Sequence, residues 1–324
     1  MKKSLLSLIL LAIGATGAMA IDANTVEIVY SGTSATVTIA SNISSIVTNV
    51  SSGSHVRLMQ SAAFAGNANG EITYVLSGTS TDGEFYLDGS YKCSVTLKGL
   101  TLTNPNGPAI NIQNGKRIKL TASSGTVNTL ADGANEDYNG CIHVKGHTEF
   151  RGKGTLNVAG NSRHAVYSKE YVQVKNLTLN ITAAQKDGIH CKQYFMMESG
   201  VLNISGTGDD GIQVELDGTV STGILYDHED EDTGNFYMLD GTLAISSYGV
   251  LAIKADGTIS YTGGTRNFNS ADVLENAISG ISDSVMADTP ATAVFDLAGR
   301  RAESPAKGIY VVRRGGQTRK VVGK

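Results

Sequence analysis

Tryptophan is absent from this chain of 324 residues, and proline and cysteine are scarce, with 4 Pro and 3 Cys. Only 17% of the residues are charged and 41% are apolar, whereas soluble domains average about 25% charged and about 45–50% apolar residues. After the first 20 positions, no apolar run approaches the roughly 20 residues that span a bilayer. These shortages exclude a membrane bundle, a coiled coil and a strongly basic nucleic-acid binder. The 38 glycines favour an all-β protein with many turns.

Charge is distributed unevenly along the chain. Residues 21–290 contain 16 Lys and Arg against 28 Asp and Glu, whereas residues 291–324 contain 8 basic and 2 acidic residues. An acidic body followed by a basic tail indicates two modules with different roles. We expect the body to be a monomer without a nucleic-acid partner or stable membrane insertion.

The cysteines Cys93, Cys141 and Cys191 are an odd number, which argues against a disulfide framework. Cys93 and Cys191 stand at inward positions of alternating strands, so we expect small buried side chains there. No Cys/His spacing typical of a zinc site is present.

Residues 1–20 have the layout of a cleaved secretory signal. Lys2 and Lys3 precede the apolar run Leu5–Ile13, and the small residues Ala18 and Ala20 follow. The apolar run is too short for a membrane anchor. We therefore expect an exported protein, either secreted or held at the outer surface.

A short unit recurs between residues 107 and 263: a small residue, Ile or Val, a polar residue, an apolar residue and a polar residue. Its apolar positions Ile142, Val166, Ile189 and Ile212 follow one another at nearly equal steps. The period is short enough to hold only about three short strands with turns, which is the size of one coil of a parallel β-helix. A β-propeller blade needs about 40 residues, so it does not fit. Strands this short indicate coils that stack and complete each other's core.

The repeat also predicts which side chains point outward, because alternate residues of a strand lie on opposite faces. Coils stack about 4.8 Å apart, so equivalent positions form columns. One column contains Asn111, His143, Tyr167, His190, Gln213 and Lys254, and the next contains Gln113, Lys145, Lys169, Lys192, Glu215 and Asp256. Such a mixture of amide, imidazole, phenol and ammonium groups is typical of a sugar-binding surface. The candidate carbohydrate-binding residues are His143, Lys145, Tyr167, Lys169, His190, Lys192, Gln213 and Lys254.

The row formed by Lys145, Lys169 and Lys192 is the sharpest feature of these columns. Neighbouring ammonium groups about 5 Å apart repel by roughly 1 kcal/mol per pair before screening. On an acidic body, such a row suits an anionic polymer with regularly spaced carboxylates. The alternative is that exposed lysines only keep strands soluble and prevent aggregation.

Carboxylates form the second signal. Asp187 and Asp210 precede glycine at equivalent positions of consecutive coils, and Asp209 adjoins Asp210. Three carboxylates so placed favour a calcium ion, which takes oxygen ligands, and Gln213 or Glu215 is a candidate to complete its shell. In the alternative interpretation, Asp–Gly is ordinary turn chemistry in which Gly188 and Gly211 supply positive φ. His164 is interpreted as a polar turn residue.

The acidic insertion at residues 227–232 is interpreted as a solvated loop, with a second cation site as the alternative. It lacks the alternating spacing and central glycine of an EF-hand loop.

Six segments together carry a family resemblance: YVLSGTSTDGEFYLDGSYK, INIQNGKRI, NTLADG, FRGKGTLNV, KDGIHCKQY and GDDGIQVE. With them, residues 72–263 resemble the secreted carbohydrate-binding β-helix family of Bacteroidetes and Clostridia. The resemblance implies a right-handed parallel β-helix that binds calcium and an acidic polysaccharide such as polygalacturonate. It also implies a fold related to calcium-dependent pectate lyases, without cleavage.

The basic tail resembles the C-terminal sorting module of Bacteroidetes secreted proteins. Phe295, Asp296 and Leu297 with Gly299 and Arg300 match the start of its pattern, and residues 307–310 match its centre. The resemblance implies a surface-anchoring or detachable address that engages secretion machinery. The predicted organisation is a signal peptide at 1–20, an N-terminal β cap at 21–69, an all-β parallel β-helix domain at 70–264, a linker at 265–290 and a C-terminal β module at 291–324.

The outward columns of side chains suggest a function. The first interpretation is a non-catalytic carbohydrate-binding protein with structural or bridging calcium. A calcium-dependent polysaccharide lyase is the main alternative, with Lys192 or Lys254 as the base that removes a proton next to a uronate carboxyl group. A galacturonan hydrolase would use Asp187, Asp209 and Asp210. A structural surface stalk would need neither metal nor sugar.

Overall fold

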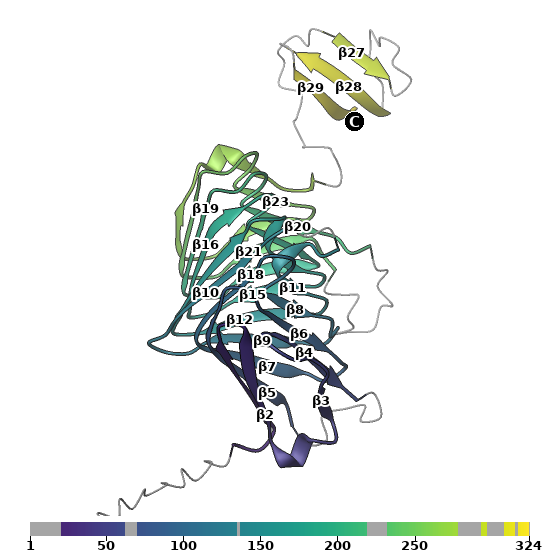
Figure 1. The fold of residues 1–324 in the computed structure, drawn as a ribbon. Coiled ribbons are helices and arrows are strands. Elements are labelled where there is room, and N and C mark those ends of the chain that lie inside the picture. The colour runs from purple at the N-terminus through teal and green to yellow at the C-terminus, as the bar shows by residue number, and fades with distance from the viewer. Residues whose placement is uncertain are drawn as a thin grey trace, which may run out of the picture.

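The structure is a computed structural model that describes residues 21–61, 70–134, 137–218 and 232–277, together with the backbone of residues 293–296, 308–314 and 317–323. Successive coils of the chain stack on one another along the body (Figure 1). Most neighbouring strands are parallel and come from successive coils. The structure confirms the predicted all-β fold, a parallel β-helix.

One side of the stack is a ten-stranded sheet with the order β26-β23-β20-β17-β14-β11-β8-β6-β4-β3. Its strands are β3 (Val47–Asn49), β4 (His55–Gln60), β6 (Glu84–Asp88), β8 (Ile110–Ile112), β11 (Gly140–Val144), β14 (His164–Ser168), β17 (Ile189–Lys192), β20 (Ile212–Glu215), β23 (Ile253–Ala255) and β26 (Val273–Leu274). The pair β3 and β4 at its end is antiparallel.

The rest of the stack is a sixteen-stranded sheet whose two arms meet at the long strand β7 (Cys93–Asn104). The first arm contains β9 (Ile118–Ala122), β12 (Thr148–Gly152), β15 (Val172–Val174), β18 (Tyr194–Met197), β21 (Asn235–Met238) and β24 (Ile259–Tyr261). The second arm contains β10 (Val127–Asp132), β13 (Thr155–Gly160), β16 (Thr178–Ala184), β19 (Val201–Ser205), β22 (Thr242–Ser246) and β25 (Thr265–Asn267).

Strands of the first coils flank this sheet. β1 (Thr25–Ser31) pairs with β2 (Ser34–Ile39) antiparallel and with β5 (Ile72–Ser80) parallel. The short 3₁₀ helices η1 (Ser41–Ile43) and η3 (Ser270–Asp272) lie in connections near the two ends of the body. A separate antiparallel sheet contains β27 (Ala293–Asp296), β28 (Gly308–Arg314) and β29 (Gln317–Gly323).

The core is a set of ladders formed by equivalent residues of successive coils. Val166 pairs in register with Ile142 on one side and with Ile189 on the other, and Ile189 pairs with Ile212. All four are fully buried, as the repeat predicts. Burying an aliphatic side chain of this size stabilises the fold by about 1.5–3 kcal/mol, so each coil depends on its neighbours for its core.

The three cysteines, Cys93, Cys141 and Cys191, are buried and unpaired in the structure, and the inward positions expected for Cys93 and Cys191 are confirmed. Cys93 belongs to β7, Cys141 to β11 and Cys191 to β17. Among the residues that the structure describes, no helix is long and apolar enough to cross a membrane.

Candidate functional site

The predicted column of outward side chains is present on the ten-stranded sheet. His143 pairs in register with Asn111 and Tyr167, and His190 pairs with Tyr167 and Gln213. Gln213 pairs in turn with Lys254. The structure also extends the column to residues that the repeat did not reveal, because Asn111 pairs with Tyr86 and Tyr86 with Arg57. Their strands β4 and β6 precede the region where the repeat is clear.

Rings of this column stack on each other. The centroids of His143 and Tyr167 are 5.1 Å apart, and those of Tyr167 and His190 are 5.5 Å apart, with nearly parallel planes in both pairs. Because each ring covers the face of its neighbour, the column offers ring edges, and not open faces, to a ligand. Burial lowers the pKa of His143 to about 4, so this ring is neutral at physiological pH.

The lysine row occupies the next outward column. Lys192 pairs in register with Glu215, and the backbone amides of Lys145 and Lys169 continue the ladder of their strands by donating to the carbonyls of Ile112 and Val144. The side chains of Lys145 and Lys169 are exposed. Lys192 is half-buried, and its Nζ lies 3.3 Å from Asp217 Oδ1. The exposed part of the row is therefore Lys145 and Lys169.

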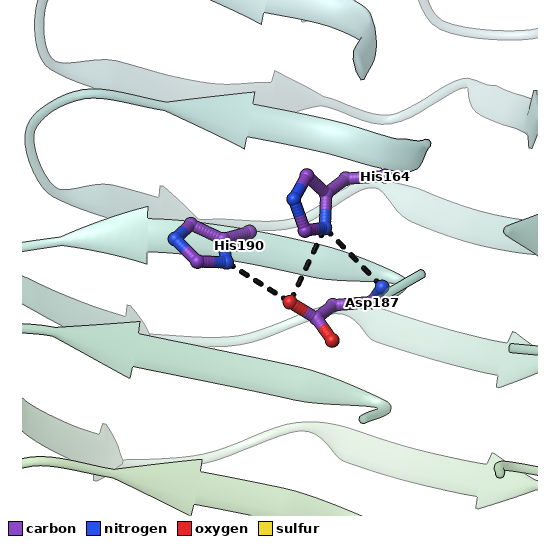
Figure 2. A group of neighbouring side chains, drawn as sticks. All are labelled: His164, Asp187 and His190. Carbon is purple, nitrogen blue, oxygen red and sulfur yellow. Dashed lines mark hydrogen bonds and ion pairs between the residues drawn. The ribbon is translucent and has the colours of Figure 1, made fainter. Parts of the chain in front are cut away.

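Asp187 is the centre of a second group, at the turn that enters β17. His164 Nδ1 lies 3.2 Å and His190 Nδ1 2.9 Å from Asp187 Oδ2 (Figure 2). Burial opposes ionisation of Asp187, but hydrogen bonds to both histidines outweigh it and hold the pKa of this carboxyl well below its usual range. Asp187 is thus a buried carboxylate between two imidazoles.

His164 was expected to be only a polar turn residue, and the structure shows that it contacts Asp187 directly. It precedes Asp187 by the same number of residues by which Asp187 precedes Asp210. That spacing equals the repeat period, so the sequence held a signal that placed His164 level with the two aspartates.

The three predicted aspartates do come together, since one carboxylate oxygen from each of Asp187, Asp209 and Asp210 lies within 4.8 Å of the others. Asp187 Oδ1 accepts a hydrogen bond from the Asp210 amide at 3.0 Å, and Asp210 Oδ1 accepts one from the Leu251 amide at 3.0 Å. Burial, together with the charges of Asp187 and Asp209, raises the pKa of Asp210 to about 6. Burial and the two neighbouring carboxylates therefore disfavour ionisation of Asp210.

Glu215, the fourth predicted ligand, does not lie with this cluster. Its Oε2 is 3.3 Å from His190 Nε2, and its Oε1 accepts a hydrogen bond from Gln213 Nε2 at 2.7 Å. The bond to His190 is the main cause that lowers the pKa of Glu215. His190 and Gln213, both predicted to bind sugar, are more than nine-tenths buried and use their polar atoms on these internal partners.

Gly188 and Gly211 follow the two aspartates for a reason that differs from the one expected. Neither has positive φ. A Cβ on Gly188 would lie 2.7 Å from the Gly211 carbonyl oxygen, and one on Gly211 would lie 2.6 Å from the Ala252 carbonyl oxygen. Close approach of the next coil, not backbone conformation, requires glycine here.

Of the acidic insertion, residues 227–231 lie outside the described residues.

The fold and these groups define a parallel β-helix with a mixed polar column on one sheet and a histidine–carboxylate group beside it. A family of carbohydrate-binding domain-containing proteins matches residues 66–298, which is more than half of the chain. The chain belongs to this family.

A solved structure supports the same fold. The polysaccharide lyase-like protein from C. thermocellum, studied as a gadolinium derivative, superposes with a TM-score of 0.55 at 19% sequence identity. The match covers 78% of this chain and 99% of that chain. No curated protein sequence matches.

Proposed function

We propose that this protein binds an acidic polysaccharide, such as polygalacturonate, on the outer face of the ten-stranded sheet. The observation that carries the proposal is the exposed pair Lys145 and Lys169 on consecutive coils. Membership in a carbohydrate-binding family supports a polysaccharide partner. Strands about 4.8 Å apart set these ammonium groups at a regular spacing that matches a chain with a carboxylate on each sugar. Neighbouring polar side chains of the column, His143, Tyr167 and Lys254, would then hydrogen-bond hydroxyl groups.

Calcium is the proposed cofactor, held by Asp187, Asp209 and Asp210. The residues fit this ion because three carboxylates converge and the pKa of Asp210 is raised to about 6, mainly by burial and then by the two neighbouring charges. Calcium prefers oxygen ligands with carboxylates among them. Bound there, it would neutralise the cluster and attract polymer carboxylates, while Asp187 continues to accept the Asp210 amide. Glu215 is left out of this proposal because it lies against His190.

The lysine row is tested by binding of polygalacturonate in affinity gels and by calorimetry. Replacing both Lys145 and Lys169 with alanine should weaken binding about tenfold, which corresponds to about 1.4 kcal/mol. The matched control is the double substitution Lys98→Ala and Lys153→Ala. It removes the same charge from two exposed lysines at the corner of the sixteen-stranded sheet, and should leave affinity unchanged. Equal losses in the two double variants would show only a general effect of charge and would contradict the proposed surface.

The calcium site is tested with Asp209→Asn, because Asp209 is the member of the cluster that is half-exposed. Calcium should raise the melting temperature of the native chain, and the substitution should remove most of that increase. Asp240→Asn, at an exposed turn, is the control. A melting temperature that calcium leaves unchanged in the native chain would overturn the metal proposal.

The same incubations separate binding from catalysis. A lyase would release an unsaturated uronate product in the presence of calcium, which is the activity that Lys192 or Lys254 would serve as base. We expect no such product, since Lys192 Nζ faces Asp217 at 3.3 Å. A surface stalk would show calcium stabilisation with no polysaccharide binding. Export through residues 1–20 and surface attachment through the C-terminal module remain proposals from the sequence.

A further inference from the structure

The meeting of two histidines at one carboxylate oxygen has chemistry that polysaccharide binding does not use. His164 and His190 are two of the six histidines of the chain, and the Nδ1 atoms of both face Asp187 Oδ2 (Figure 2). One ligand atom from each of the three side chains lies within 4.8 Å of the others. We propose that His164, Asp187 and His190 bind a divalent transition metal ion, with zinc as the ion tested.

Donor type distinguishes this site from the neighbouring aspartate cluster, although Asp187 belongs to both. Two imidazole nitrogens and one carboxylate oxygen suit zinc and related ions, whereas calcium takes oxygen ligands. Two bonds of about 2.05 Å at a tetrahedral angle place their ligand atoms about 3.3 Å apart. The observed separations of 3.2 and 2.9 Å from Asp187 Oδ2 to the two nitrogens are close to that value, and all three atoms lie within 4.8 Å of one another.

The second ring nitrogen of His190, Nε2, has a carboxylate partner, as the second ring nitrogen of a metal-binding histidine usually does. Its Nε2 lies 3.3 Å from Glu215 Oε2, and Gln213 Nε2 donates to Glu215 Oε1 at 2.7 Å. Metal-binding histidines usually donate their second ring nitrogen to such a partner, which fixes the ring orientation. Glu215 is thus a positioning residue that directs Nδ1 of His190 towards Asp187.

His164 is directed into the site by the backbone. His164 Nδ1 also lies 3.2 Å from the backbone amide nitrogen of Asp187, so this ring nitrogen faces the turn, and a metal ion bound there would replace the hydrogen bond that Nδ1 makes. The ring centroids of His164 and His190 are 4.5 Å apart. The two rings come from adjacent strands β14 and β17, and their paired backbones hold the ligands in place.

An ion also needs access and room for one more ligand. The side chains of His164 and His190 are 9% and 10% exposed, and that of Asp187 is 1% exposed. The carboxylate is therefore shielded, while each imidazole side chain keeps a small part of its surface in contact with solvent. Three protein ligands leave a fourth position for water, as in zinc sites that stay open.

The test measures zinc binding to the full chain, without a polyhistidine tag and without polysaccharide, by isothermal titration after treatment with a chelator. We expect one zinc ion per chain, and a loss of affinity of more than about 100-fold in His164→Ala and in His190→Gln. Glutamine is chosen because Gln213 occupies the same column on the next coil. Circular dichroism and thermal melting show whether each variant is folded.

Two control variants define the site. His55→Ala removes a histidine that lies 2.9 Å from Asp82 in an exposed position, and zinc affinity should stay within about twofold. Asp209→Asn should likewise leave zinc affinity within about twofold, although it weakens calcium binding. Unchanged zinc affinity in a folded His190→Gln, or an equal loss in His55→Ala, would overturn the proposal.

The native chain provides a readout that does not depend on variants. In ¹⁵N spectra of the histidine side chains, zinc should shift the Nδ1 resonances of two rings out of six. Shifts spread over other histidines, or none at stoichiometric zinc, would contradict the site. Because no polysaccharide is present, the outcome is independent of the proposed function.

Discussion

Two faces of the same stack carry their side chains in different ways. On the second arm, Asn157, Asn180 and Asn203 occupy one column. Asn180 Nδ2 donates to Asn157 Oδ1 at 2.8 Å, and Asn203 Nδ2 donates to Asn180 Oδ1 at 2.9 Å. On the ten-stranded sheet, the column changes residue type at every coil, from histidine to tyrosine to histidine to glutamine.

The difference separates stacking from ligand chemistry. An amide ladder satisfies its own donors and acceptors from coil to coil, so it stabilises the stack and leaves little for a ligand. A mixed column cannot do this, and its polar atoms contact other side chains instead, as His190 contacts Asp187 and Glu215. Charged and titratable groups gather on this side as a result.

The largest expected loss of stability comes from replacing Asp187, the carboxylate beside the mixed column of the ten-stranded sheet. Asp187→Ala leaves two imidazoles and the Asp210 amide without their acceptor. Removal of one member of a buried charged group typically costs about 3–5 kcal/mol, and urea unfolding should show a loss in that range. A loss below about 1 kcal/mol, the worth of an ordinary hydrogen bond, would mean that Asp187 is no more important than a member of the amide ladder.

The glycines of the same turns come next. Gly211→Ala brings a Cβ to 2.6 Å from both the Ala252 carbonyl oxygen and Ile245 Cγ2, and overpacking of this kind costs about 1–3 kcal/mol. Gly115→Ala is the control, because nothing lies within 4 Å of its Cβ position. Thermal melting compares the two, and equal melting temperatures would contradict the close-approach argument.

Asp132, a buried acid in β10 of the second arm, should make the free energy of unfolding depend on pH. Burial raises the pKa of Asp132 to about 6, although the amides of Asn161 and Ser162 oppose the shift. Because the folded pKa lies above the unfolded value of about 3.9, its stabilising contribution is complete below about pH 4 and is lost as the pH rises through 6.

Asp132→Asn should remove that dependence. We expect the difference in unfolding free energy between pH 4 and pH 7 to change by about 1–3 kcal/mol in the variant. Urea unfolding at the two pH values measures it. Identical pH profiles for the native chain and the variant would contradict the raised pKa.

The smallest effect is expected within the ladder itself. Asn180→Ala breaks two amide hydrogen bonds at a partly exposed position and should cost about 1 kcal/mol. Polygalacturonate and zinc affinities should not change, because the second arm takes no part in either proposed site. A clear loss of polysaccharide binding would show that the ligand lies on the second arm.

Much of this arrangement could be predicted from the sequence. The spacing of Ile142, Val166 and Ile189 predicts the register that the structure shows, and the register brings Asp187 near Asp210. The direction of a side chain at a turn was not predictable, because it depends on local backbone and rotamer. For this reason Glu215 was assigned to the aspartates although it bonds to His190, and the role of His164 was missed.

The reason why position 188 requires glycine could not be predicted from the sequence either. Alternation and turn rules consider one coil at a time, whereas the contact that requires glycine is made by the carbonyl group of the next coil. Contacts between coils become visible only once both coils are placed.

The position of the histidines within the stack has a consequence for exchange with solvent. β14, β17 and β20 are interior strands of the ten-stranded sheet, with β23 and β26 beyond them at the nearer end. Each coil of a solenoid is held only by its two neighbours. Fraying must then begin at the outermost coils and travel inward, so amide protons around residue 190 should be among the last to be replaced by deuterium.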